Sequence, residues 1–403
     1  MHKIAVCTLS RSEYGLMKHF IRLAAERINT WLILGAGHLA ESHGYSAKEV
    51  YADLPVPRHK ILVADFEPEL ESATSIAGTV SKGLNAIARI LQQHHFDAVV
   101  VMGDRYELFS VSLAALFYKI PLVHFSGGEV SEGAIDDSIR HATTKLSHLH
   151  LVANRQCAGN VSLMGEEDWR IVITGEPGMD NIHQCDIATD LELETQFGIS
   201  PKYPVLLVTL HPSTLETGLT VEAQYRPVLK ALAKLDRYQV VMTAPGAEEG
   251  AMAMIAAYEQ FAAMHRHIIW APHLGSRNYL AVMRLATAVV GNSSSGLVEA
   301  PAFGVPTVNI GNRQKNRMCS EAVIHVGYHT DAIIEAIEKA STTEHRALCG
   351  QADNPYDPYH DGQNSQRGVE AIIKFLTIKD FQDRITKKFD TQTDPAQWNT
   401  LLT

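Results

Sequence analysis

Short apolar runs alternate with longer amphipathic stretches from the first residues of the chain onward. Nearly continuous apolar runs are typical of strands buried on both faces of a parallel sheet, and amphipathic stretches are typical of the helices that cover it. In the first half, strands are predicted at residues 3–8, 31–34, 97–102, 122–125, 149–153 and 171–174. Helices are predicted at residues 14–27, within 72–95, and at 107–118, 137–146 and 155–164.

The alternation restarts in the second half of the chain. Strands are predicted there at residues 205–210, 239–243, 268–270, 288–290, 307–310 and 323–325. Helices are predicted at residues 221–234, 247–264, 279–285 and 331–340, with a last one at 369–376. The pattern therefore predicts an α/β fold with two doubly wound, Rossmann-like sheets.

The two predicted sheets are separated by the breaker-rich segment Gly175-Glu176-Pro177-Gly178 and a polar stretch. Since 403 residues exceed what one core usually serves, two domains are expected. We place their boundary near 177–190 and predict domains over 1–178 and 179–376. The tail 377–403 is expected to cross back to the first domain or to fray. Ligands of such sheets bind beyond the carboxyl ends of strands, so a site between the domains is predicted.

A turn of small residues follows the apolar run 286–290 and reads Gly291-Asn292-Ser293-Ser294-Ser295-Gly296. Backbone N–H groups and hydroxyls in such a strand–helix turn favour an anion, most naturally a phosphate or diphosphate. Glu299 lies one turn further on, where a carboxylate can accept hydrogen bonds from a sugar diol. The alternative is a serine-capped helix without a ligand, and the local pattern leaves both open.

Cationic and hydroxyl side chains suited to a diphosphate come from both halves of the chain. They are Arg11, Arg105, His211, Ser293, Ser294 and Arg313. His211, which precedes a proline, is equally compatible with a buried histidine at a strand end. The pair Arg140-His141 falls on a predicted helix, and it either reaches the site or lies on the surface.

Carboxylates gather on or near the strand-end loops of the first half. They are Asp104, Glu107, Glu129, Glu132, Asp136 and Asp137. Carboxylates that face one cleft can hold different pKa values and divide acid and base roles. The alternative is that several of them only cap helices.

Composition and charge exclude several classes of protein. The net charge of −10 argues against a nucleic-acid surface, and no stretch is apolar enough to span a bilayer. Five cysteines without metal-type spacing and no signal-peptide pattern predict a cytoplasmic protein with free thiols. GxGxxG, GxSxG and P-loop motifs are absent, which counts against nicotinamide, esterase and ATPase sites. We expect a homodimer without a nucleic-acid or membrane partner.

Several motifs occur together in a specific order. They are Ser10-Arg11-Ser12-Glu13-Tyr14-Gly15, Gly103-Asp104-Arg105-Tyr106-Glu107, Gly127-Gly128-Glu129, Asp136-Asp137-Ser138-Ile139-Arg140-His141, His211-Pro212, Gly291–Gly296 and Gly311-Asn312-Arg313-Gln314. With these motifs, most of the chain resembles the hydrolysing UDP-N-acetylglucosamine 2-epimerases of sialic-acid and related nonulosonic-acid synthesis.

The resemblance implies a GT-B architecture of two Rossmann-like domains with an interdomain active-site cleft, and no metal or nucleotide cofactor. It implies that the C2 proton of the sugar is removed while UDP leaves C1, and that water then adds with inverted C2 configuration. Asp104 and Asp136 match carboxylates that the family uses for catalysis. The positions that match UDP-binding residues are Arg11, Arg105, His211, Ser293, Ser294, Glu299 and Arg313.

Three departures from the family pattern stand out. Several relatives carry a catalytic Glu where this chain has Ser126, so Glu129 or Glu132 is expected to supply that carboxylate, or the substrate differs. One residue is inserted within 130–135, which leaves UDP-N-acetylglucosamine and UDP-N,N′-diacetylbacillosamine as candidate substrates. The loop 246–250 lacks the Asn and Asp that relatives tend to show. A GT-B glycosyltransferase and an inert UDP-sugar sensor are the competing functions.

Overall fold

The computed structural model describes residues 2–41, 44–69, 72–132, 134–184, 187–213, 216, 218–246 and 248–402. The chain forms two compact units. The first unit comprises Met1–Glu129, Asp136–Gln184 and Tyr356–Thr403. The second unit comprises Val130–Ile135 and Cys185–Pro355.

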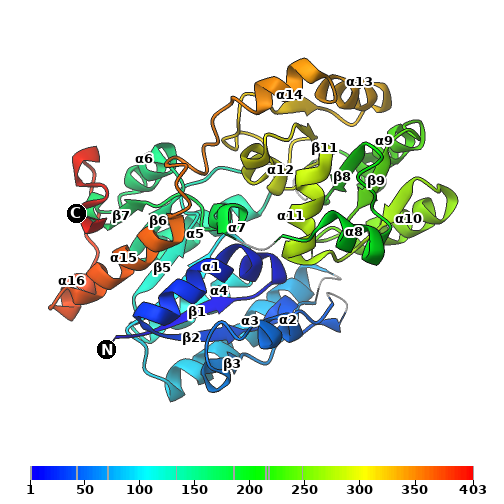
Figure 1. Ribbon diagram of the computed structural model, residues 1–403. Helices are drawn as coiled ribbons and strands as arrows, with labels where there is room; N and C mark the ends of the chain where they lie inside the picture. The colour runs from blue at the N-terminus through cyan, green and yellow to red at the C-terminus, as the bar shows by residue number, and fades with distance from the viewer. Residues whose placement is uncertain are drawn as a thin grey trace. The chain divides into compact units, whose positions relative to one another are not determined.

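The first unit is built on a parallel seven-stranded sheet with the order β3-β2-β1-β4-β5-β6-β7 (Figure 1). Its central strands are buried on both faces, as the apolar runs predict. The strands are β1 (Lys3–Thr8), β2 (Asn29–Leu34), β3 (Ile61–Val63), β4 (Ala98–Met102), β5 (Leu122–Phe125), β6 (Leu149–Val152) and β7 (Ile171–Ile173).

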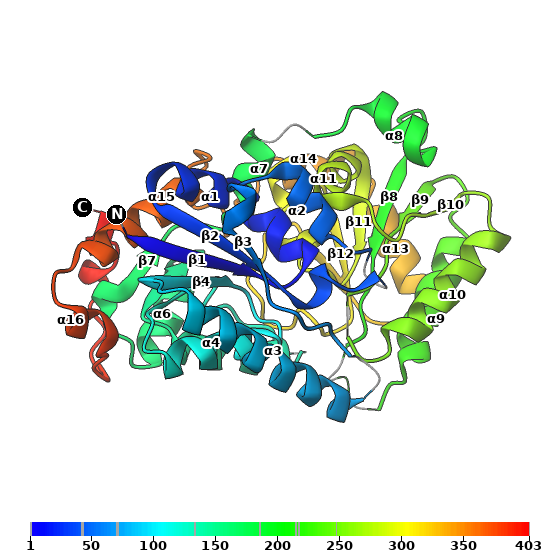
Figure 2. The same cartoon turned by 90° about the horizontal axis from the view of Figure 1, so that it is seen from below.

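Helices cover both faces of this sheet. On one face, α1 (Arg11–Arg27) packs beside α15 (Asn364–Thr377), and the rings of Phe20 and Phe125 meet edge-on at 4.9 Å between centroids. On the other face, α3 (Ala73–Gln93) and α4 (Leu108–Phe117) lie side by side (Figure 2). The remaining helices of the unit are α2 (Ala47–Asp53), α5 (Asp136–Leu146), α6 (Arg155–Leu163), α7 (Gly178–Gln184) and α16 (Phe381–Ile385).

The second unit contains a parallel six-stranded sheet with the order β10-β9-β8-β11-β12-β13. Its strands are β8 (Val205–Thr209), β9 (Gln239–Met242), β10 (Ile268–Trp270), β11 (Ala286–Gly291), β12 (Thr307–Ile310) and β13 (Ile324–Val326). Its helices are α8 (Asp190–Phe197), α9 (Val221–Ala233), α10 (Ala251–Met264), α11 (Gly275–Leu285), α12 (Ser295–Val298), α13 (Thr330–Ala340) and α14 (Thr343–Cys349).

The predicted α/β class with two parallel sheets is confirmed, but the predicted domain bounds need correction. Residues 356–376 were assigned to the second domain, whereas α15 packs on the first unit. The reason is that Val369, Ile372 and Phe375 form an apolar stripe that completes the core against α1. Conversely, the segment Val130–Ile135 belongs to the second unit rather than to the first.

Two further features bear on the sequence-based expectations. Within the part of the chain that the structure describes, no helix is long and apolar enough to cross a membrane. Cys7, Cys157, Cys319 and Cys349 are free thiols, while Cys185 lies outside the described residues.

Candidate active site

In the first unit, the loops that follow β4 and β5 are joined directly. Gly103 N donates to Phe125 O (3.2 Å), and His124 Nε2 lies 2.8 Å from Gly103 O. Because a carbonyl only accepts, the His124 hydrogen must be on Nε2. Burial lowers the pKa of His124 to about 4, so the ring is neutral at pH 7. The predicted catalytic residue Asp104 is therefore anchored next to the end of β5.

A buried arginine holds this loop in place. The side chain of Arg140 on α5 is 1% exposed and forms an ion pair with Asp104. Its Nη1 also donates to Glu129 O (3.1 Å) and lies 3.5 Å from Asp137 Oδ1. Asp136, the other carboxylate that the resemblance assigns to catalysis, is the first residue of α5. Arg140 therefore ties Asp104 to the start of α5.

The loop after β1 adds a second group of charges. Glu13 is buried and accepts a hydrogen bond from Leu9 N (2.7 Å). Burial raises the pKa of Glu13 to about 7, although the nearby Arg105 guanidinium acts in the opposite direction. Arg105 Nη2 donates to the buried Glu107 carboxylate (2.9 Å). Arg11 is the first residue of α1, and partial burial lowers its pKa.

The two carboxylates expected to compensate for Ser126 lie in different units. Glu129 is buried in the first unit, and its carbonyl oxygen accepts from Arg140. Glu132 is exposed in the second unit, where it pairs with Lys315 Nζ (3.0 Å) and accepts from Asn316 Nδ2 (2.8 Å). The carboxylate that Ser126 itself contacts is Glu176, a residue that the sequence did not single out.

In the second unit, Asn292 organises the predicted UDP-binding turn after β11. Its side chain bridges the backbone of His211, accepting from N (2.7 Å) and donating to O (2.8 Å). The backbone carbonyl oxygen of Asn292 accepts hydrogen bonds from Arg313 Nη1 (3.4 Å) and Gln314 Nε2 (2.8 Å). The structure thus brings His211, Arg313 and the serines of the turn together, although they are far apart in sequence.

The predicted helix after this turn is short. α12 has four residues, and a 3-10 turn, Ala300–Phe303, follows it. The contribution of a helix dipole is therefore small, and hydroxyls and turn N–H groups provide the anion-binding character. Ser293 Oγ already accepts from Ser295 Oγ (3.1 Å). Glu299 ends α12 and is buried, which raises its pKa to about 7.

An acidic side chain, that of Glu248, lies against Arg313 and His211. Glu248 Oε1 is 3.1 Å from Arg313 Nη2 and 3.3 Å from His211 Nδ1. Gly246 N donates to the same His211 Nδ1 (2.9 Å). The loop that departs from the family pattern therefore supplies a negative charge beside the predicted diphosphate site.

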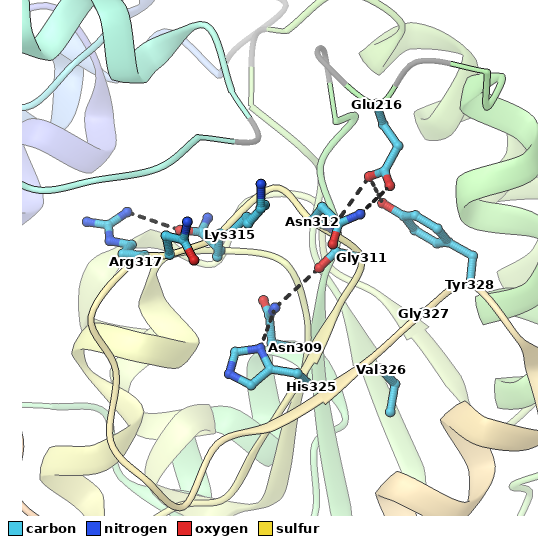
Figure 3. Close-up of a pocket in the computed structure, with 12 residues that line it drawn as sticks. Glu216, Asn309, Gly311, Asn312, Lys315, Arg317, His325, Val326, Gly327 and Tyr328 are labelled. Atoms are coloured by element: carbon cyan, nitrogen blue, oxygen red, sulfur yellow. Dashed lines mark hydrogen bonds between the residues drawn. The ribbon is translucent and has the colours of Figure 1, made fainter.

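A polar cavity of about 500 Å³ lies at the ends of β12 and β13 in the second unit (Figure 3). Asn312 Nδ2 donates to Glu216 Oε1 (2.8 Å), and the Tyr328 hydroxyl donates to the same carboxylate (Oε2, 3.4 Å). Asn309 and His325 line its floor and lie 3.2 Å apart. Amide and hydroxyl linings of this kind suit a ligand rich in hydroxyl groups. The sequence reasoning missed Asn309, His325 and Tyr328, because nothing local marks them.

Among the residues that the structure describes, no group of three or more His, Cys, Asp or Glu side chains is placed to hold a metal ion.

Two Rossmann-like units with their polar residues on strand-end loops define the GT-B class of fold. The chain belongs to the UDP-N-acetylglucosamine 2-epimerase family, whose model matches residues 22–373. This confirms the resemblance seen in the motifs.

The relatives are similar over nearly their whole length. Polysialic acid biosynthesis protein P7 of Escherichia coli is 31% identical to this chain, and the aligned region covers 95% of this chain and 97% of the relative. The GDP/UDP-N,N′-diacetylbacillosamine 2-epimerase (hydrolyzing) of Campylobacter jejuni is 30% identical, with coverages of 85% and 88%. The crystal structure of the Neisseria meningitidis UDP-GlcNAc 2-epimerase bound to UDP-GlcNAc has a TM-score of 0.75 at 18% identity, with coverages of 92% and 100%. This last likeness shows the fold.

Proposed function

We propose that this protein is a hydrolysing UDP-N-acetylglucosamine 2-epimerase, which converts UDP-N-acetylglucosamine and water into N-acetylmannosamine and UDP. The observation that carries the proposal is the buried Arg140, which forms an ion pair with Asp104 next to the start of α5. A fixed guanidinium holds the Asp104 carboxylate in one orientation, as a base requires.

The proposed reaction has two steps. In the first, a carboxylate takes the C2 proton, a C1–C2 double bond forms, and the C1–O electron pair leaves with UDP. In the second, a proton returns to C2 on the opposite face and water adds at C1. We assign the acid and base roles to Asp104 and Asp136, and we keep Glu129 and Glu132 as further candidate carboxylates.

The departing diphosphate needs positive charge and hydrogen-bond donors. In the proposal, Ser293 and Ser294 with His211 and Arg313 hold it in the second unit, since Asn292 places these groups together. Arg11 and Arg105 of the first unit contact the same ligand. Glu299 binds the ribose hydroxyls.

UDP-N,N′-diacetylbacillosamine is the second candidate substrate. The Campylobacter relative named as a hydrolysing epimerase of that sugar is 30% identical to this chain. This similarity favours UDP-N,N′-diacetylbacillosamine as an alternative substrate. Its further acetamido group needs room and polar partners, and the amide-lined cavity of the second unit offers both.

The test incubates the purified protein with each UDP-sugar and follows the products by proton and phosphorus NMR. Free UDP together with a free 2-epimerised sugar, formed without any acceptor, is the expected result. A UDP-sugar epimerised with its diphosphate retained would contradict hydrolysis. Product formed only with an added acceptor would indicate a glycosyltransferase, and binding without turnover would indicate a sensor.

A further inference from the structure

Ser126 directly follows β5 and has an unusual backbone. Its φ is +64°, in the left-handed region that residues other than glycine rarely adopt. Gly128, two residues on, has φ +78°, and a Cβ there would lie 2.3 Å from Cys157 O. The chain therefore makes a tight turn that fixes the direction of the Ser126 hydroxyl.

The Ser126 hydroxyl meets a carboxylate from a distant part of the sequence. Ser126 Oγ donates to Glu176 Oε2 at 2.8 Å, and the two residues are 6% and 5% exposed. Glu176 lies just after β7, and β5 and β7 both flank β6 in the sheet. Because the Ser126 hydroxyl donates to this buried carboxyl oxygen, its hydrogen points to Glu176.

The backbone around this pair is held on both sides. Glu176 N donates to Tyr356 O (2.9 Å), and Asn364 Nδ2 donates to Glu176 O (3.2 Å). Ser126 N donates to Leu151 O (3.1 Å). The pair is therefore preorganised by the sheet and by the start of α15.

The backbone next to Ser126 is joined to the loop that carries Asp104. The residue before Ser126 accepts a hydrogen bond from Gly103 N, and His124 contacts Gly103 O. Asp104 is the next residue in that loop. The Asp104 loop is thus tied to the end of β5, and Ser126, the residue after β5, presents an oxygen whose own hydrogen points to Glu176.

We propose that Glu176 is a positioning residue that acts through Ser126 on the water that adds at C1. The inference rests on the proposed function. The Ser126 Oγ lone pair accepts a proton from that water as its oxygen bonds to C1. At the same time, the original Ser126 hydrogen passes to Glu176 Oε2. The water O–H bond breaks, the C1–O bond forms, and C2 receives its proton from a protonated carboxyl group.

This role predicts a specific product change. Glu176→Gln and Ser126→Ala should leave UDP release intact but slow hydration by roughly 10²-fold, because a proton acceptor is lost. The unsaturated 2-acetamido sugar should then accumulate, and the ratio of that sugar to free epimerised sugar should rise. Glu176→Asp keeps a carboxylate and should therefore hydrate the unsaturated sugar faster than Glu176→Gln does.

The experiment measures UDP, the unsaturated sugar and the free sugar by NMR in the whole protein, with UDP affinity by calorimetry and unfolding by heat. Glu166→Gln is the matched control, since Glu166 is a buried carboxylate in the same unit whose partners are His150, Lys145 and Lys387. It should lower the melting temperature without changing the product ratio.

The outcomes separate the two hypotheses. Wild-type protein that releases no UDP from either substrate overturns the proposed function and this inference with it. Wild-type activity with an unchanged product ratio in both Glu176→Gln and Ser126→Ala overturns the role of Glu176 alone. Loss of UDP release in folded Glu176→Gln also overturns it, because the pair would then act in the first step. If Glu176→Gln does not fold, Ser126→Ala decides.

Discussion

At the scale of single residues, the candidate site is a set of cations held by carboxylates. Arg140 is held by Asp104 in the first unit, and Arg313 by Glu248 in the second. Such pairs fix geometry, and the pair of Arg313 with Glu248 also means that a diphosphate bound at Arg313 competes with a carboxylate already present. The pairs differ in what their removal should do.

Glu248→Gln should strengthen UDP binding. The carboxylate lies 3.1 Å from Arg313 and 3.3 Å from His211, where it opposes an incoming diphosphate. Removing one negative charge at this partly screened position should contribute about 1 kcal/mol, or roughly fivefold in affinity. Calorimetry with UDP measures the change in affinity. Glu249→Gln is the control, because Glu249 is an exposed neighbour and its substitution changes the charge by the same amount. Weaker binding in Glu248→Gln alone would show that the carboxylate positions the cations.

Asp104→Asn and Asp136→Asn should both slow UDP release by roughly 10²–10⁴-fold, because an acid–base group is lost. They should differ in stability. Asp104→Asn weakens a charged partner of the buried Arg140 and should cost about 1–3 kcal/mol of unfolding free energy. Asp136→Asn removes one negative charge from the first turn of α5 and should cost less than about 1 kcal/mol. Urea unfolding and an assay of released UDP test both, and near-full activity in both folded variants would refute the catalytic assignment.

Glu13→Gln should remove a pH dependence of stability. Burial raises the pKa of Glu13 from 4.5 to about 7, so the folded state binds the proton more tightly than the unfolded state. This stabilising contribution is complete below about pH 4.5 and is lost as the pH rises towards 7. Urea unfolding should therefore show that Glu13→Gln matches the wild type at pH 4.5 but is more stable at pH 8. The exposed Glu26→Gln is the control, and an equal effect of both substitutions would exclude Glu13 as the source.

At the scale of elements, the C-terminal segment is docked by one buried arginine. Arg170 is 1% exposed and donates to the carbonyl oxygens of Asp383, Arg384 and Thr386. The indole of Trp398 donates to Asp168 Oδ1 (2.8 Å) further along the same segment. The tail is therefore a structural part of the first unit.

Arg170→Met should release this segment. The three bonds to carbonyl oxygens of the tail are lost, together with the bond to His148 O and the ion pair with Glu167. A buried side chain of similar length remains, so the change should cost a few kcal/mol. Hydrogen exchange should speed up within residues 380–402 while β4 and β5 stay protected. The exposed Arg89→Met should leave exchange in the tail unchanged. Unaltered tail exchange in Arg170→Met would show that the apolar contacts of the tail suffice.

The elements also show what sequence patterns can predict. Nearly all strands and long helices follow from apolar periodicity, since that periodicity is a direct consequence of burial. Which sheet an amphipathic helix covers is not encoded locally, and so α15 was assigned to the wrong unit. The same limit applies to the site. Strand-end loops marked Asp104 and Ser293, whereas the contact of Ser126 with Glu176 joins residues 50 positions apart through the order of the strands.

At the scale of the whole molecule, the two units exchange segments of chain. Val130–Ile135 and Cys185–Pro355 form the second unit, so the chain passes between units four times. Glu129 and Glu132 illustrate the consequence. They are close in sequence, but Glu129 belongs to the first unit, whereas Glu132 belongs to the second and pairs there with Lys315. Our proposal divides the UDP contacts between the units in the same way, and this division can be tested on the intact protein.

If UDP contacts Arg11 and Arg105 of one unit and Arg313 of the other, as we propose, its binding should make the molecule more compact. Small-angle scattering at saturating UDP should then give a smaller radius of gyration than the free protein. Ser293→Asp is the matched control, since its carboxylate repels the diphosphate and should abolish both UDP binding and the change in scattering. Identical curves for the wild type with and without UDP, at a concentration where calorimetry shows saturation, would contradict ligand-driven closure. Full UDP affinity in Ser293→Asp would instead remove the diphosphate from the turn after β11.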